Sequence, residues 1–476
     1  MLEKLFKLKE NGTDVKTEVI AGLTTFMTMA YIIALNPNLL TGFGAYGQEL
    51  WNAVFLATCI ASAFGTILMA FLANKPFAMA PGMGLNSFFA TVVLNIVTIA
   101  GVSYVSGYQA GLIIILIEGV IFLILSVLNI RQKIVEAIPL GIRLGISPGI
   151  GLMLMNIGFG SNAGVYDATG TPNYVMQHFF GALSAKNLAQ TIGPDAWTSL
   201  VLTTVTMFVG LFAIVALNHR KVKGSVLYGM LIASVVYWAG EFIFMGINPF
   251  GTLATASWIP PFKDMAALTL CKFDFETFKS LGIVTIVTLI LTFGIIDMFD
   301  TIGTVVGTAS RAKMIDENGN VPNMKEILIS DAVGTLAGSV TGTSTVTTFI
   351  ESASGVEAGG RTGLTAITTG LMFLACMFIS PIAALIPAAA TSSALIYVGI
   401  LMLQGLGNID LTDISVAVPV FVMLLAMPIS GSIGHGIGLG LISYSIIKVL
   451  TGKAKDVSTL TWIISIIFLI KFFVVL

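Results

Sequence analysis

The sequence has little charge: only 10% of its 476 residues are Asp, Glu, Lys or Arg, whereas 56% are hydrophobic. Soluble domains carry about 25% charged residues, so this deficit argues against a soluble globular protein and indicates a membrane protein. A net charge of −1 argues against a nucleic-acid partner, because such proteins need a basic surface. The chain has only three cysteines, Cys59, Cys271 and Cys376, which lie too far apart for a disulfide framework or a zinc site.

The apolar residues gather in segments long enough to cross a bilayer, and such segments recur along the whole chain. We therefore predict an all-α integral membrane protein with about 14 transmembrane segments. A further apolar segment, 457–476, fits either an extra span or a helix at the membrane surface. The predicted spans are 17–37, 51–73, 78–99, 110–130, 139–160, 197–218, 224–247, 281–309, 326–340, 343–358, 363–386, 389–407, 412–429 and 432–450.

The positions of Lys and Arg predict the orientation of these spans. The leader 1–16 and the segments 131–133, 219–223 and 452–455 are rich in Lys and Arg, and all fall on one side in this count. Since basic loops stay in the cytoplasm, we predict a multi-pass protein of the cell membrane with a cytoplasmic N-terminus. The segment 251–280 carries both lysines and acids, and we predict that it is an external loop with a charged surface helix.

The span count predicts internal symmetry. Fourteen spans divide into two halves of seven, and an odd number of spans places the second half upside down relative to the first. Residues 138–158 and 386–406 align without a gap, each starting with Ile-Pro, and this pairs span 5 with span 12. Chance similarity between apolar helices is the alternative explanation. Two inverted 7-span repeats are typical of secondary transporters.

Two spans at matching positions in the halves are irregular. Span 3 opens with KPFAMAPGMGLNSFFA (75–90) and span 10 with TGTSTVTTFIESASG (341–355), and in both we predict a non-helical start followed by a helix. Irregular backbone at membrane depth is tolerated only where it is buried in protein or lines a cavity, so the pair predicts a binding site at the midplane. Asn86 and Glu351 are expected just inside the helical parts. The alternative is a Gly-rich crossing that only lets helices pack closely.

Further acids lie in the predicted spans. Asp297 and Asp300, in LTFGIIDMFDTIGTVVG (291–307), are three residues apart and therefore share one helix face. Acids without a basic neighbour are costly in a membrane, so we expect at least one of them to face a cavity. Glu118, in the middle of span 4, has two interpretations that the sequence leaves open: a bond to a neighbouring helix, or a place on a proton path.

Four segments together resemble a known family. They are GTDVKTEVIAGLTTFMTMAYIIALNP (12–37), APGMGLNSFFA (80–90), IIDMFDTIGTVVG (295–307) and TTFIESASGVEAGGRTGLTA (347–366). They resemble the purine permeases of the AzgA-like branch of the nucleobase–cation symporter-2 family, and the resemblance covers almost the whole chain. It implies a fold like that of uracil permeases, in which spans 3 and 10 are broken and each contributes a short strand and a half-helix to the substrate site.

The resemblance also implies a division into two domains. A core domain would comprise residues 1–130 (spans 1–4) and 281–387 (spans 8–11), with 251–280 as the external loop before its second part. A gate domain would comprise 131–250 (spans 5–7) and 388–476 (spans 12–14 and the last apolar segment). Members of the family often dimerise through the gate domain, so a homodimer is an expectation from the resemblance alone.

Motif matching assigns substrate roles to Asn86, Asp297 and Glu351. Gly84 and Asp300 match family positions that matter to the site or to transport. The Gly-Leu-Asn form of residues 84–86 resembles hypoxanthine and guanine members more than adenine members. The resemblance therefore implies uptake of purine nucleobases, with hypoxanthine and guanine favoured over adenine.

The chemistry of an oxopurine fits these residues. Its ring N–H groups can each donate a charge-assisted hydrogen bond to a carboxylate, and an Asn amide or backbone N–H can meet its carbonyl. Phe349, with Phe88 and Phe89, is considered for a stacking wall, although for at least two of the three we favour ordinary packing. We expect no cofactor and no metal site.

Proton coupling is the expected driving force, with Asp300, Asp297 and Glu351 as carriers and with the core moving against the gate like an elevator. An adenine permease of the same family is one alternative. A membrane enzyme that uses the same three acids is another, but the sequence has no metal-ligand, nucleophile or phosphate-binding motif. A channel or an anion transporter on the same fold would need a neutral or basic site.

Overall fold

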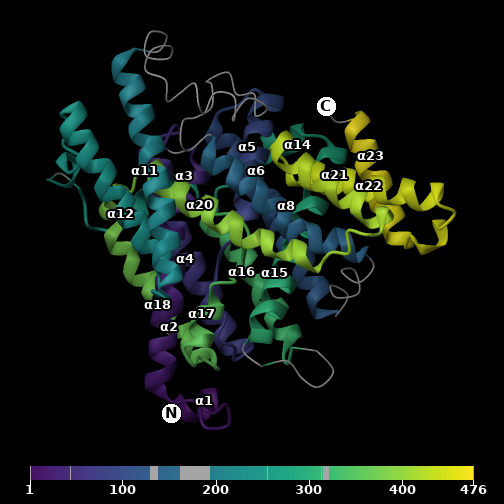
Figure 1. Ribbon diagram of the computed structural model, residues 1–476, viewed down its shortest axis with the longest axis horizontal. Coiled ribbons are helices and arrows are strands. Elements are labelled where there is room, and N and C mark those ends of the chain that lie inside the picture. Colours follow the sequence, from purple (N-terminus) through teal and green to yellow (C-terminus); the bar gives the residue numbers. More distant parts are fainter. Residues whose placement is uncertain are drawn as a thin grey trace.

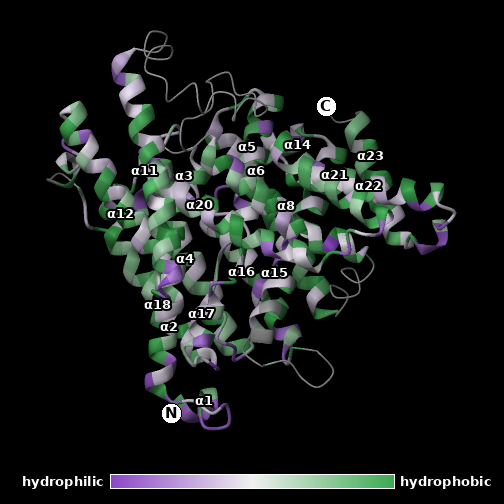
Figure 2. Cartoon of the chain, viewed as in Figure 1, coloured by the Kyte–Doolittle hydropathy of each residue, from purple (hydrophilic) through white to green (hydrophobic). Residues whose placement is uncertain are grey.

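The computed structural model describes residues 2–42, 44–128, 138–160, 193–254, 256–311, 314 and 321–474. The basic segment 131–133, used for the orientation, lies outside the described residues. Among those described, eleven helices are long and apolar enough to cross a membrane. Figure 2 shows apolar residues along most helices and polar residues gathered near the N-terminus and at the ends of helices. The chain is thus a mostly helical membrane protein.

The first span is interrupted, which the sequence did not predict. Helix α2 (Val15–Met29) is followed by the two residues Ala30 and Tyr31, and α3 (Ile32–Leu40) then continues with Pro37 in its interior. The other elements of this half are α1 (Leu2–Phe6), α4 (Gln48–Leu72), β1 (Met79–Pro81), α5 (Met83–Ala100), α6 (Tyr104–Val127), α8 (Leu140–Phe159), α11 (Pro194–His219), α12 (Ser225–Gly240) and the π-helical turn η2 (Glu241–Met245).

The segment predicted as an external loop contains short elements only. These are η3 (Gly251–Ala254), α13 (Phe262–Leu268) and α14 (Phe275–Ser280). The second half follows with α15 (Ile283–Arg311), α16 (Met324–Thr341), β2 (Val346–Thr348), α17 (Ser352–Glu357), α18 (Gly363–Cys376), η4 (Met377–Ile379), α19 (Ser380–Ala383), α20 (Ala388–Met402), η5 (Leu403–Asn408), α21 (Ile414–Ser430), α22 (Ile433–Leu450), η6 (Ala454–Asp456) and α23 (Thr459–Val474).

Three of the predicted spans are not among the eleven. The span at 343–358 contains a strand and a helix of only six residues, and the span at 412–429 forms a helix of 17 residues. The span at 326–340 lies in α16, which is less apolar than the spanning helices because it includes two acids, Glu326 and Asp331, as well as serines and glycines.

By their packing contacts the described helices form two groups, and Figure 1 shows where each helix lies. In one, α16 packs against α4 and α6, and α18 packs against α2 and α4. In the other, α20 packs against α8 and α11, while α21 packs against α8 and α22. The two strands belong to the first group, where β1 contacts α4 and β2 contacts α16.

Candidate functional site

The two irregular segments meet in a two-stranded antiparallel sheet. Strand β1 pairs with β2 so that Met79 faces Thr348, Ala80 faces Thr347 and Pro81 faces Val346. At one end the backbone N–H of Gly82 donates to the carbonyl of Thr345 at 3.1 Å, and at the other that of Phe349 donates to Ala78 at 2.9 Å. Every residue of both strands is buried. We refer to this pairing of β1 with β2 as the strand crossing.

Glu351 lies just beyond the strand crossing, directly before α17 rather than inside it. Its side chain is partly buried, and Oε1 accepts a hydrogen bond of 2.7 Å from the phenol of Tyr31. Tyr31 is buried and stands at the interruption of the first span. Because a carboxylate has about four acceptor positions, this one bond orients Glu351 and leaves it able to accept from a ligand.

Asn86, on the first turn of α5, is completely buried and held within the protein. Its Nδ2 donates to Oδ1 of Asn36 at 2.6 Å and to the carbonyl of Pro81 at 3.1 Å, and its Oδ1 accepts from the hydroxyl of Ser344. Asn36 in turn donates to Thr343 at 2.9 Å. Both donor hydrogens of Asn86 are therefore used internally in this conformation, and its carboxamide joins the two irregular segments.

Asp297 and Asp300 lie on α15 beside the strand crossing. Asp297 is completely buried, whereas Asp300 is partly buried. A Cβ atom added at Gly82 would lie 3.3 Å from Oδ2 of Asp300, so this carboxylate borders the end of β1. The hydroxyl of Thr301 lies 3.4 Å from Oδ1 of Asp297. The structure thus places Asp297 and Asp300 beside the strand crossing and Glu351 just beyond it; that the three form a shared site stays a prediction.

Gly84 has a different place from the acids. A Cβ atom at this position would lie 2.6 Å from Cγ2 of Ile150, so glycine allows α5 to approach α8 closely. Gly84 therefore lies where the two groups of helices meet.

The aromatic residues are mainly packed. Phe88 contacts Phe293 with ring centroids 4.6 Å apart, and Phe89 meets Tyr108 edge-on at 5.1 Å. Both are buried in the apolar core, as favoured for at least two of the three phenylalanines. Phe349, directly after β2, belongs to the same apolar core and is 6% exposed, and it precedes Glu351 by two positions.

Two further acids lie in this region: Asp331, which the sequence analysis did not single out, and Glu118, for which it left two interpretations open. Asp331 on α16 is completely buried and accepts a hydrogen bond of 2.7 Å from Thr301. Glu118 accepts a hydrogen bond of 3.3 Å from Thr345, which precedes β2, and so bonds the segment that leads into the strand crossing. The acid Asp331 was visible in the predicted span 326–340, but only the fold brings it to Thr301.

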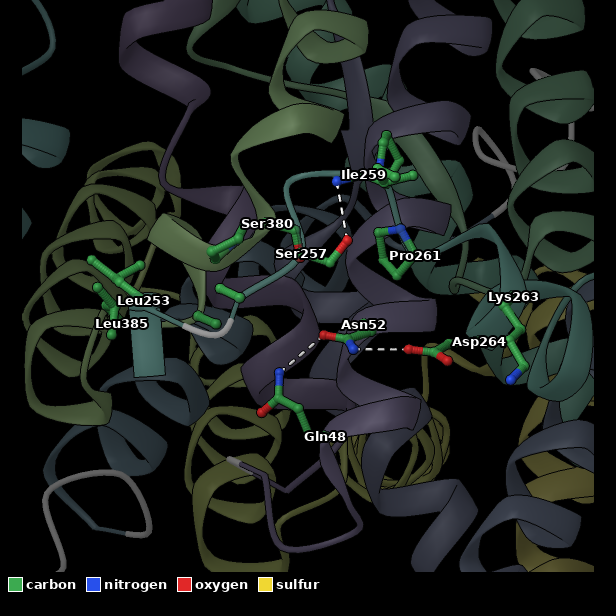
Figure 3. A pocket seen from close by; sticks show the side chains of 14 residues that line it. Gln48, Asn52, Leu253, Ser257, Ile259, Pro261, Lys263, Asp264, Ser380 and Leu385 are labelled. Atoms are coloured by element: carbon green, nitrogen blue, oxygen red, sulfur yellow. Dashed lines mark hydrogen bonds between the residues drawn. The ribbon is translucent and has the colours of Figure 1, made fainter. Parts of the chain in front are cut away.

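A cavity of about 600 Å³ lies elsewhere, against the segment predicted as an external loop. Gln48 and Asn52 of α4 line it together with Asp264, and Asn52 donates to Asp264 at 2.8 Å (Figure 3). None of the predicted site residues lines this cavity. The candidate site at the strand crossing is therefore identified by its side chains.

Metal ligands do not gather in the described residues, where no group of three or more His, Cys, Asp or Glu side chains could hold a metal ion. The donors near the strand crossing are carboxylates, hydroxyls, carboxamides and one phenol. Such a set can accept N–H hydrogen bonds from a planar polar ligand and can exchange protons.

The fold is similar to that of solved transporters. The transmembrane domain of the cyanobacterial bicarbonate transporter BicA matches with a TM-score of 0.62 and 15% identity, covering 88% of this chain and 97% of that chain. The structure of SLC26A9 matches with a TM-score of 0.63 and 11% identity, covering 92% of this chain and 66% of that one. At these identities the likeness concerns the fold alone.

Sequence comparison finds closer relatives. The model described as "Permease family" matches residues 16–433. The adenine permease AdeP of Escherichia coli (strain K12) is 37% identical, over 99% of this chain and 96% of its own length. The guanine/hypoxanthine permease PbuO of Bacillus subtilis (strain 168) is also 37% identical, over 99% of this chain and 100% of its own length.

Proposed function

The chain belongs to this permease family, the nucleobase–cation symporter-2 family, and from that premise we propose that it couples purine uptake to protons and favours hypoxanthine and guanine. The observation that carries the proposal is the group of acids at the strand crossing, Asp297, Asp300 and Glu351. No Lys or Arg occurs in the segments 280–310 and 326–360 that contain them. The protein is a transporter and not an enzyme, which removes the alternative that used these acids for catalysis.

The purine is bound between Glu351 and Asp297, each accepting one ring N–H group. Tyr31 orients Glu351, and Asn86 supports the site from behind by joining β1 and β2. Phe349 covers an edge of the base. A site built to bond a particular N–H rejects a base that lacks it, because a buried acceptor is then left unpaired. This is the reason for favouring 6-oxopurines over adenine, since relatives named for either base are equally similar.

The coupling proton is carried by the same acids. Asp300 is only partly buried, so it can receive a proton from water and pass it towards Asp297 and Glu351. Protonation lowers the charge that must cross an apolar interface when the loaded site moves, and a buried charge is costly there.

Transport follows from movement between two domains. The core comprises residues 1–130 and 281–387, and the gate comprises 131–250 and 388–476, as two inverted 7-span repeats with a cytoplasmic N-terminus in the cell membrane. The packing of α16 and α18 apart from α20 and α21 supports this division. Gly84, at the contact with α8, allows the core to slide past the gate in an elevator-like motion. A homodimer through the gate would hold the gate fixed.

The decisive experiment is uptake of radiolabelled hypoxanthine into proteoliposomes under an imposed pH gradient, with and without a sodium gradient. We expect accumulation to follow the pH gradient, and guanine to compete better than adenine. Accumulation that follows sodium alone would reject proton coupling, and stronger competition by adenine would assign the chain to adenine transport. If Asp300→Asn accumulates hypoxanthine as well as the wild type, Asp300 does not receive the proton.

A further inference from the structure

One buried hydroxyl connects three elements at the strand crossing. Oγ1 of Thr301, on α15, lies 2.7 Å from Oδ1 of Asp331 on α16 and 3.4 Å from Oδ1 of Asp297, one turn earlier on its own helix. It also lies 2.7 Å from the hydroxyl of Thr347 in β2. All four residues are completely buried. The Thr301 hydroxyl therefore stands between two carboxylates and against the strand of the site.

The hydrogen atoms at this hydroxyl can be counted. Thr301 has one hydrogen to donate, and its oxygen has two lone pairs that can accept. The shorter contact indicates that this hydrogen goes to Asp331, and Thr347 can donate to the oxygen of Thr301. Oδ1 of Asp297 then faces a second lone pair of Thr301, which is repulsive for a carboxylate and favourable for a carboxylic acid. The geometry is therefore best satisfied when the two acids together hold one proton.

Other acids surround the pair, and basic residues are missing from several segments around it. Asp300 on α15 is close enough to interact electrostatically with both Asp331 and Glu351. Glu118, on the packed helix α6, bonds Thr345 next to β2. The segments 17–74 and 76–130, like those around the acids themselves, contain no Lys or Arg. Two further helices that pack against α15 do carry basic residues, Arg143 on α8 and His435 and Lys448 on α22. Protons can lower the charge of the acids in addition to any effect of these groups.

We propose that Asp331 holds the coupling proton jointly with Asp297, with the Thr301 hydroxyl as the bridge between the two carboxylates. In one form Asp297 is protonated and donates to Thr301, which donates to Asp331. In the other form, Asp297 has passed its hydrogen to Thr301, and Thr301 has passed its own hydrogen to Asp331. Thr301 then donates to Asp297, and Asp331 is the carboxylic acid. The proton is neither gained nor lost in this shift. Since Thr301 also hydrogen-bonds Thr347, the shift directly affects a hydrogen bond of β2.

This inference rests on the proposed proton coupling and adds a residue to it. Asp331 does not touch the base in this arrangement, so it is a positioning residue that acts through Thr301 and Asp297. Asp300 receives the proton from water, whereas the Asp297–Asp331 pair stores it. The consequence is a separation of two activities, because binding of the base needs Asp297, whereas coupling needs the whole bridge.

The test compares Asp331→Asn with the wild type in proteoliposomes. Asparagine can still accept from or donate to Thr301, but the pair can no longer exchange a proton. We expect counterflow exchange of hypoxanthine to stay within about threefold of the wild type, whereas accumulation driven by a pH gradient falls by about tenfold or more. We also expect the affinity for hypoxanthine to lose its dependence on pH. Equal accumulation and an unchanged pH profile would overturn the proposal.

Substitutions of the bridge provide a second test that does not depend on the stability of the Asp331 variant. Thr301→Val removes the hydroxyl, and we expect it to abolish pH-driven accumulation, whereas Thr301→Ser restores it. Thr308→Val is the matched control, because Thr308 is buried on the same helix and its hydroxyl has no hydrogen-bond partner in the described part of the chain. If Thr301→Val accumulates hypoxanthine as well as Thr308→Val, the bridge is refuted. If accumulation of hypoxanthine by the wild type does not respond to the pH gradient, the proposed proton coupling itself is refuted.

Discussion

The phenol of Tyr31 donates a hydrogen bond of 2.7 Å to the carboxylate of Glu351, although 320 positions separate the two residues in the chain. The bond joins the interruption of the first span to the residue that precedes α17. It fixes one oxygen of the carboxylate and thereby the direction in which the other can accept. The first span thus takes part in a site that the sequence assigned to spans 3, 8 and 10.

Replacing Tyr31 with Phe removes this donor and keeps the ring. A hydrogen bond to a charged group contributes about 1.5–3 kcal/mol, and a carboxylate that is no longer oriented binds the base less well. We expect the affinity for hypoxanthine to fall by about tenfold or more, measured as equilibrium binding to purified protein. Tyr104→Phe is the matched control, because Tyr104 is also buried and donates to the carbonyl of Leu40 instead. Equal affinities in the two variants would contradict the role of Tyr31.

Glu351→Gln and Asp297→Asn keep the shape of each side chain and remove the charge. Each loses one charge-assisted hydrogen bond to the base, so binding should weaken by roughly one to two orders of magnitude. The same binding measurement checks this. Glu357→Gln, an exposed position at the end of α17, should bind like the wild type. Unchanged binding in both site variants would remove these acids from the substrate site.

Glu18 is a completely buried acid with a structural role that spacing alone did not reveal. Its carboxylate accepts from the backbone N–H groups of Arg361 at 2.8 Å and Thr365 at 3.1 Å, and so joins α2 to the start of α18. Glu18→Ala would leave these buried donors unpaired, at about 1–3 kcal/mol for each group. We expect a clearly lower midpoint temperature of unfolding, whereas Glu357→Ala, at an exposed position, should unfold like the wild type. Equal midpoints would mean that water replaces the carboxylate.

Asp14 caps the first turn of α2, and this cap depends on pH. Hydrogen bonds from the backbone and side chain of Thr17 lower the pKa of Asp14 below its ordinary value of 3.8. A lowered pKa in the folded state means that the stabilising effect is present above pH 3.8 and is lost as the pH falls through the folded value. We expect the protection of the first amides of α2 from hydrogen exchange, corrected for intrinsic rates, to fall over that range.

Two variants separate the cap from other effects of pH at Asp14. In Asp14→Ala the first amides of α2 should be as weakly protected from hydrogen exchange at neutral pH as those of the wild type are in acid, because the acceptor is gone. Asp14→Asn keeps an acceptor oxygen without a titrating group, so its protection should not change with pH in this range. Protection in Asp14→Ala equal to that of the wild type at neutral pH would show that the cap is unimportant.

The sequence predicted which irregular segments belong together better than it predicted the contacts of their side chains. Prolines, glycines and a Thr-rich run mark the irregular segments, and acids are conspicuous in apolar spans, so Asp297, Asp300 and Glu351 could be found from local pattern. Whether a side chain faces a ligand or another residue depends on contacts between distant segments. Asn86 illustrates this, because its spacing is compatible with either role, but the fold directs its amide to Asn36.

Tyr31 and Asp331 were missed for the same physical reason. A tyrosine in an apolar span is compatible with membrane packing, and an acid in the relatively polar α16, which also contains Glu326, suggests nothing about its partner. Only the interruption of the first span brings Tyr31 to Glu351. Only the packing around α15 and β2 brings Asp331 to Thr301. Hydrogen bonds between residues 320 positions apart, as for Tyr31, or 30 positions apart, as for Asp331, have no signature in the periodicity of one chain.

The strand crossing also has a consequence for how the protein is made. The backbone N–H of Ala78 bonds the hydroxyl of Ser352, which follows it by 274 positions, and β1 has β2 as its partner in the same way. The first half is synthesised before the second, so β1 remains without its pairing strand until β2 has been made. Unsatisfied backbone groups are costly in the lipid environment. Until β2 is made, the unpaired backbone groups of β1 therefore need water, the insertion machinery or a neighbouring helix to satisfy them. Expressing the halves as separate polypeptides would reveal whether this interval can be prolonged without loss of the protein.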